Sequence, residues 1–150
     1  IVRDAIAAGV PLGVYGVGWS EFIDAEYVRG EFLPNPDVPA AYASAGIVLN
    51  DHWPQMAAEG FLSNRLFDAV ASGARVISDE AAGLQEVFGD AVVTYSSAEQ
   101  LREILQAPLD SAFASRERRL ANAERIARDH GFDARASELI AAALEMRGAR

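Results

Sequence analysis

Three short apolar runs, separated by stretches that favour helix, constrain the fold of this chain more than any other feature. The runs are residues 47–49, 75–78 and 91–95, and the stretches between them are residues 66–72 and 84–88. Strands that alternate with helices through short turns predict a parallel sheet covered by helices on both faces. The unbroken run Ile-Val-Leu at 47–49 is typical of a strand buried on both sides. After it we expect a loop of about a dozen residues, long enough to be a candidate binding loop. We therefore expect the α/β class, as a three-layer, Rossmann-like domain.

The two ends of the chain supply the remaining predicted elements. Before the central region we expect a helix at residues 2–8, strands at 12–16 and 31–33, and a helix at 38–45. After it we expect a helix at 97–105 and two long C-terminal helices at 115–130 and 134–147. Glycine and proline residues bound most of these segments, as is usual where an element ends.

Length and composition indicate one folded domain over residues 1–150. Hydrophobic residues make up 51% of the chain and charged residues 23%, so a core can form. The first residue is Ile1 rather than methionine, and a helical pattern starts at once. We therefore expect this domain to be part of a longer protein.

The charge distribution argues against several classes of partner. The net charge is −9, and every formally positive side chain is an arginine. An acidic chain of this kind is a poor match for nucleic acid or for an anionic membrane surface. There is no cysteine, which excludes disulfides and thiol chemistry. No apolar run approaches the ~20 residues that a membrane span needs, so we expect a cytoplasmic domain with no membrane segment.

Residues 59–78, with the sequence EGFLSNRLFDAVASGARVIS, are the segment most suited to binding a ligand. They predict a loop, a helix at 66–72 capped by Ser63 or Asn64, a glycine turn and a buried strand. Ligands of α/β sheets bind where such loops lead into helices, and free amides at a helix start favour anions. Arg65 adds a cationic fork suited to phosphate oxygens. Asp68, expected on the first turn of the helix, could accept hydrogen bonds from ribose hydroxyls, and Glu59, in the loop, could do the same for a sugar.

This segment resembles the donor site of the group 1 (family 4) glycosyltransferases of GT-B architecture. Their pattern is an acid, Gly-Phe, a short loop, a second acid, and then Ala-x-Ala-small-Gly-x-x-Val-Ile. The branch of spore-maturation-type glycosyltransferases is the most similar, through a Gly-Phe-Leu-Ser-x-Arg-x-Phe-acid-Ala run. The resemblance extends to residues 33–42, 47–50 and 83–89, and more weakly to 130–135.

The resemblance implies a function and a role for each matching residue. The chain would be the C-terminal half of a GT-B fold, binding a nucleoside diphosphate sugar, with the acceptor held by an N-terminal domain absent from this chain. Family members transfer the sugar with retention and usually without a metal or other cofactor. Glu59, as the catalytic residue, would contact the transferred sugar, and Asp68 would bind the ribose. Amides around Phe61–Asn64, which include Leu62 and Ser63, would hold the diphosphate with help from Arg65, and Gly60 would also belong to the donor site. Backbone near Phe32–Asn35, which includes Leu33 and Pro34, would receive the base.

Three departures from the family pattern bear on catalysis. The second acid is Asp68 where glutamate is usual, and it lies one residue further from Glu59 than in better-known members. The lysine that often assists the diphosphate is missing, so this task would fall to Arg65. The sequence accordingly favours donor binding over efficient catalysis.

Other interpretations remain open at the level of sequence. The same pocket could serve a non-catalytic nucleotide-sugar sensor, or the domain could be an interaction module without a nucleotide site. A dinucleotide oxidoreductase is disfavoured, because Gly16-Val-Gly18 lacks the third glycine of that fingerprint and predicts a turn.

Several polar residues outside the motif have no assigned chemistry. His52 could line the cleft or pack within its loop. His130 precedes a glycine and suits the end of a helix. The arginines at 116, 118 and 119 predict a solvated helix face or a contact with a missing domain. The histidines and carboxylates show no metal-ligand spacing, so we expect no metal site.

Overall fold

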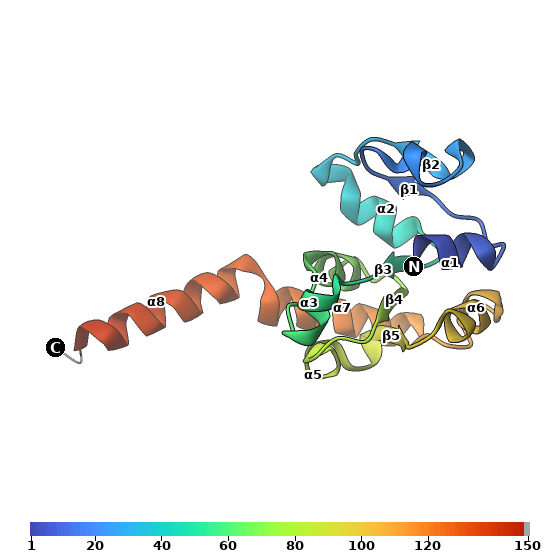
Figure 1. Ribbon diagram of the computed structural model, residues 1–150. Helices are drawn as coiled ribbons and strands as arrows, with labels where there is room; N and C mark the ends of the chain where they lie inside the picture. Colours follow the sequence, from blue (N-terminus) through green and yellow to red (C-terminus); the bar gives the residue numbers. More distant parts are fainter. Residues whose placement is uncertain (149–150) are drawn as a thin grey trace.

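In the computed structural model, which describes residues 1–148, the strands form two parallel sheets (Figure 1). The first sheet pairs β1 (Val14–Tyr15) with β2 (Val28–Gly30). The second has the order β3–β4–β5, with β3 at Val48–Asn50, β4 at Val76–Asp79 and β5 at Val92–Tyr95. The predicted α/β class, the parallel pairing and the Rossmann-like alternation of strands and helices are confirmed, and the strands are divided between two sheets.

The helices alternate with these strands along the chain. They are α1 (Val2–Ala7), α2 (Val38–Ser44), α3 (Pro54–Ala58), α4 (Asn64–Ala71), α5 (Leu84–Phe88), α6 (Ala98–Gln106), α7 (Arg116–His130) and α8 (Phe132–Gly148). Short 3-10 turns lie at Trp19–Glu21, Ala25–Tyr27, Asn35–Asp37 and Gly89–Ala91. The predicted turn at Gly16-Val-Gly18 leads into the first of these turns, so the region lacks the helix that a dinucleotide fingerprint requires.

Helix α4 is the centre of the hydrophobic core. Its buried residues Leu66, Ala69 and Val70 face the three-stranded sheet and helix α7. Val76 of β4 and Ile126 of α7 belong to the same cluster. Burying such a side chain contributes about 1.5–3 kcal/mol, so this cluster holds α4 in a fixed position against the ends of β3 and β4.

Two sequence-based predictions in the N-terminal half need correction. Residues 31–33 do not form a strand; the strand lies earlier, at Val28–Gly30. It pairs with only two residues of β1, and Phe32 is 72% exposed, so extending the strand would bury no further apolar surface. Residues 51–62, expected as one long loop, contain the helix α3. Pro54 at its first turn has the backbone angle that a helix start requires.

The helix of the motif also begins earlier than predicted. It starts at Asn64 rather than at residue 66, because Ser63 caps it. Asp68 is therefore the fifth residue of α4 and lies in its second turn rather than its first. The C-terminal pair is confirmed, with α8 beginning at Phe132 rather than at residue 134.

Helix α8 extends away from the rest of the domain (Figure 1). Among residues 1–148, its main contact is with α7. It carries exposed apolar side chains, of which Phe132 is 95% exposed and Leu139 is 73% exposed. Within residues 1–148, the helices are either too short or too polar to cross a bilayer.

The central role of α4 can be tested by comparing a leucine-to-alanine substitution at a buried site with the same substitution at an exposed site. We expect Leu66→Ala to lower the free energy of unfolding by about 2–5 kcal/mol, because it leaves a cavity beside Val70 and Ile126. The matched control Leu139→Ala, on exposed α8, should change it by less than about 0.5 kcal/mol. Urea denaturation measures both. Equal effects of the two substitutions would contradict a core centred on α4.

Candidate functional site

The candidate site is built on the carboxyl ends of β3 and β4, where polar side chains meet. Asn50 and Ser78 are partners in the register of the two strands, and both are fully buried. The Asn50 amide Nδ2 donates to Ser78 Oγ at 3.0 Å, and Ser78 Oγ donates to Asp79 Oδ1 at 3.1 Å. Parallel pairing therefore brings three polar residues from distant parts of the sequence into one chain of hydrogen bonds.

His52 joins this chain to the loop that carries the motif. Its Nδ1 lies 2.6 Å from Asp79 Oδ1, and its backbone N–H donates to Asp79 Oδ2 at 3.1 Å. On the other side of the ring, Nε2 is 3.2 Å from the backbone nitrogen of Ser63. A backbone N–H only donates, so Nε2 must be the acceptor and the ring proton must sit on Nδ1. The tautomer of His52 is thus set by its two neighbours.

Ser63 begins helix α4 while bound to His52. Its Oγ accepts a hydrogen bond from the Arg65 N–H at 3.3 Å, which makes Ser63 the N-cap rather than Asn64. The Arg65 guanidinium reaches Asn50 Oδ1 at 3.5 Å, a long contact that leaves most of its donors free. The start of α4 is therefore tied to the strand ends at two points.

Gly60 shapes the loop between α3 and α4. Its φ is +69°, in the left-handed region that favours glycine. A Cβ atom on this residue would lie 3.0 Å from the carbonyl oxygen of Ala82, in the turn before α5. Both the backbone angle and the close approach therefore favour glycine at this position.

Not all the amides predicted to hold a diphosphate are free. The Phe61 N–H donates to the Met56 carbonyl at 2.9 Å, and the Ser63 N–H is taken by His52. In the part of the chain that the structure describes, the N–H groups of Leu62 and Asn64 donate to no other residue. Within the run Phe61–Asn64, these two amides remain available to a ligand.

The two acids of the motif are exposed near this loop. Glu59 lies at the end of α3, where a carboxylate opposes the helix dipole and so does not serve the stability of that helix. Asp68 lies on the solvent side of α4, one turn beyond Asn64 and Arg65. Arg65 and Asp68 thus lie in the first two turns of α4, and Glu59 precedes the loop that leads into this helix.

The residues predicted to receive the base lie in a separate segment. Leu33, Pro34 and Asn35 lead into the turn at Asn35–Asp37 and then into α2, which packs against α4. Among residues 1–148, no hydrogen bond or ion pair joins this segment to the motif. Its part in a shared site remains a prediction.

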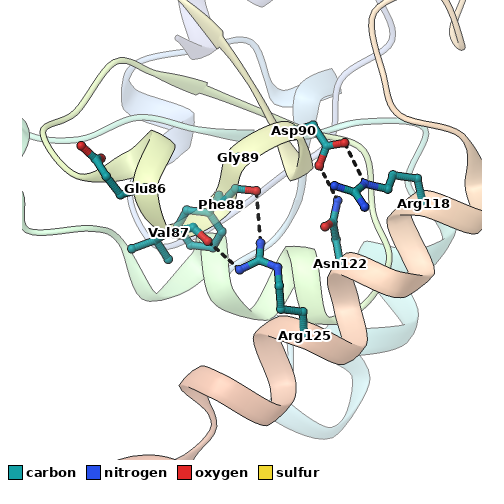
Figure 2. Close-up of a pocket in the computed structure, with 8 residues that line it drawn as sticks. All are labelled: Glu86, Val87, Phe88, Gly89, Asp90, Arg118, Asn122 and Arg125. Carbon is teal, nitrogen blue, oxygen red and sulfur yellow. Dashed lines mark hydrogen bonds and ion pairs between the residues drawn. The ribbon is translucent and has the colours of Figure 1, made fainter.

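The surface has two hollows next to the segments around α5. One, of about 540 Å³, lies between α3 and the turn before α5 and is lined by Pro54, Ala57, Ala58, Glu80, Ala81 and Ala82. The other, of about 420 Å³, lies between α5 and α7 (Figure 2). The first adjoins the motif, whereas the second lies where α7 docks onto the domain.

The polar groups of the second hollow are engaged with one another (Figure 2). Arg118 donates to Asp90 at 2.9 Å, as does Asn122. Arg125 donates to the carbonyls of Val87 and Phe88, at the end of α5. The hydrogen bond from Arg118, and then that from Asn122, holds the pKa of Asp90 below its ordinary value of 3.8. This hollow is therefore a docking contact of α7.

The predicted solvated face at the start of α7 is found at Arg116 and Arg118, which are both exposed, but not at Arg119, which is partly buried. Arg118 pairs with Asp90, and Arg119 donates to the carbonyls of Gly73 and Ala114. Arg116 is exposed, as expected. Arginine can cap free carbonyls because its fork carries several donors, and the sequence gives no sign of which carbonyls will lie nearby.

Several carboxylates act on Tyr95 at the ends of the strands. Tyr95, opposite Asp79 in the register of β4 and β5, has its pKa raised to about 12. Burial is the main cause, followed by the carboxylates of Asp79, Asp51 and Asp4. An anionic ligand at this edge would therefore depend on nearby amide donors and on Arg65.

Sequence reasoning left three members of the network unassigned: Asn50, Ser78 and Asp79. A signal for them exists, because each is a polar residue at the end of a predicted apolar strand, where ligand sites of α/β sheets lie. His52 was left between two roles; the structure buries it in its loop, in contact with Asp79 and Ser63.

Comparison with known proteins identifies the family. A family model described as "Glycosyl transferase-like" matches residues 1–141. No curated protein and no solved structure gave a significant match. The chain belongs to this glycosyl transferase-like family, in agreement with its Rossmann-like fold.

The close approach at Gly60 yields a prediction with a matched control. Gly83 has a similar φ of +78° but open space around its missing Cβ, so Gly83→Ala tests the backbone angle alone. We expect Gly83→Ala to cost about 1 kcal/mol of stability, and Gly60→Ala about 1–3 kcal/mol more because of Ala82. Urea denaturation compares them. A smaller effect at Gly60 would mean that the loop yields freely.

The raised pKa of Tyr95 can be observed directly. Ultraviolet titration of phenolate absorbance should show a component with a midpoint of about 12 that is missing in Tyr95→Phe. Because the folded state favours the neutral phenol, Tyr95 makes its full contribution to the free energy of unfolding below its ordinary pKa of 10. It is lost as the pH rises towards about 12. Persistence of this component in Tyr95→Phe would contradict the assignment.

Proposed function

We propose that this chain is the donor-binding domain of a glycosyltransferase and that it binds a nucleoside diphosphate sugar at the start of α4. The sugar would pass, with retention and without a metal, to an acceptor held by an N-terminal domain outside this chain. Membership of the glycosyl transferase-like family supports the reaction class. The observation that carries the site is the pair of unengaged amides, Leu62 and Asn64, in the segment that leads into α4 and includes Arg65, whose guanidinium reaches Asn50.

Each part of such a donor has a chemical match near this helix start. The free amides and Arg65 would hold diphosphate oxygens, through charge-assisted hydrogen bonds. Asp68, one turn along the same face, would accept bonds from the ribose hydroxyls. Glu59 would face the transferred sugar, and the segment from Leu33 to Asn35 would receive the base.

The chemical step requires stabilisation of the negative charge that develops on the leaving diphosphate. Fixed amide dipoles and Arg65 can supply it without moving during the reaction, which is the usual large contribution to such a step. Because Arg65 is the one cationic side chain of the motif from Glu59 to Asp68 and the chain carries a net charge of −9, its charge should matter strongly. Domain closure would then position the acceptor.

The test is a titration of UDP, GDP, ADP and dTDP into the isotope-labelled chain, followed by backbone amide shifts. We expect one nucleotide to shift Leu62, Asn64 and Arg65, with an affinity near ~1 mM for a half-site. Arg65→Gln should weaken it about tenfold, the effect of losing one charged hydrogen bond. Arg102→Gln, an exposed arginine on α6, is the control and should leave it unchanged.

The possible outcomes separate the candidate functions. No shift with any of the four nucleotides, well above ~1 mM, would overturn the donor site and favour an interaction domain. Shifts confined to Asp90, Arg118 and Arg125 would place an anion at the α7 contact instead. Binding at α4 without transfer or hydrolysis by a longer form containing an acceptor domain would favour a nucleotide-sugar sensor.

A further inference from the structure

We propose that His52 is a positioning residue that holds the start of α4 in the orientation needed for the donor diphosphate. This inference rests on the proposed function. His52 would act through Ser63, whose N–H donates to Nε2, while Asp79 fixes the ring from the opposite side.

The ring of His52 is held in one orientation by its surroundings. Its side chain is fully buried, at 0% exposure, and both ring nitrogens are engaged. Asp79 accepts three hydrogen bonds, from the His52 ring, the His52 backbone N–H and Ser78 Oγ. A rotation of the ring would leave buried polar groups without partners, which costs about 1–3 kcal/mol for each group.

The contact with Ser63 determines which amides of the loop face outwards. The Ser63 N–H belongs to the peptide plane that it shares with Leu62, so its bond to His52 fixes that plane. Ser63 Oγ then caps the Arg65 N–H and sets the following turn. The Leu62 and Asn64 amides, on either side of this anchored residue, remain free. Without His52, the loop would have to find a new partner for the Ser63 N–H.

A direct catalytic role does not fit the same geometry. A histidine paired with a carboxylate often acts as a base through its second nitrogen. Here that nitrogen, Nε2, lies against the Ser63 backbone and is buried rather than open to a ligand. The pair of His52 and Asp79 therefore serves to orient the loop.

Two substitutions of His52 separate its two hydrogen bonds. The asparagine amide lies near the position of Nδ1, so His52→Asn can still donate to Asp79 but leaves the Ser63 N–H without its acceptor. The glutamine amide reaches the position of Nε2, so His52→Gln can supply an oxygen to Ser63 but loses the bond to Asp79. His130→Asn, at the other histidine of the chain, is the control for loss of an imidazole.

The first measurement needs no ligand. Nitrogen-15 spectra of the imidazole should show His52 as a neutral ring protonated on Nδ1. Amide hydrogen exchange at Ser63 should be faster in His52→Asn than in the wild type, and close to wild type in His52→Gln and His130→Asn. Unchanged exchange at Ser63 in His52→Asn would overturn the proposal.

The second measurement is the nucleotide titration with the same variants. We expect His52→Asn to bind the preferred nucleotide about fivefold more weakly, as for one lost hydrogen bond, and His52→Gln to recover most of the affinity. Equal weakening in both variants, in proportion to their lost stability, would show a merely structural histidine and overturn the proposal. If the wild type binds none of the four nucleotides, the proposed function fails, while the exchange at Ser63 still decides whether His52 holds the loop.

Discussion

Helix α4 is packed between the three-stranded sheet and α7, and the position of the candidate site depends on this packing. The buried side chains of α4 hold the helix against the sheet and α7; they are Leu66, Ala69 and Val70. Helix α7 is in turn held by hydrogen bonds from its arginines to carbonyl and carboxylate oxygens of neighbouring segments; these arginines are Arg118, Arg119 and Arg125. With the helix body held by apolar contacts, a few hydrogen bonds at Ser63 suffice to fix its first turn. Preorganisation of this kind matters because a ligand that must order a loop loses part of its binding free energy.

The electrostatics of the domain make that first turn important for any anionic ligand. The chain carries a net charge of −9, and Asp4, Asp51 and Asp79 help to keep Tyr95 neutral at the strand ends. A nucleoside diphosphate would meet this negative field at close range. Amide dipoles and the Arg65 guanidinium can offset it locally because they act over hydrogen-bond distances, whereas the acids lie further away or are themselves hydrogen-bonded, as Asp79 is.

The contacts of the α7 arginines and of His52 could not be predicted from sequence patterns. The sequence shows that arginines lie on this helix, but it does not show their partners. The partners are Asp90, Gly73 and Val87, which lie 28 to 46 residues away along the chain. The strand at 31–33 was predicted from an apolar pair bounded by proline, yet β1 offers only two residues to pair with. The helix α3 was missed although Pro54 and the residues after it suit a helix, because a long loop before a motif was expected to be irregular.

The sequence by itself determined the class of fold, the order of its main strands and helices, the cap at Ser63 or Asn64, and the family that its motif resembles. The first three follow from local chemistry, because apolar periodicity, glycine and proline positions, and capping side chains act over a few residues, whereas the family rests on the resemblance of the motif. Only the tertiary structure decided that Asn50, His52, Ser78 and Asp79 form one network and that Ser63 is anchored by it. The physical reason is the register of β3 and β4, which sets residues 28 positions apart side by side and which no local pattern specifies.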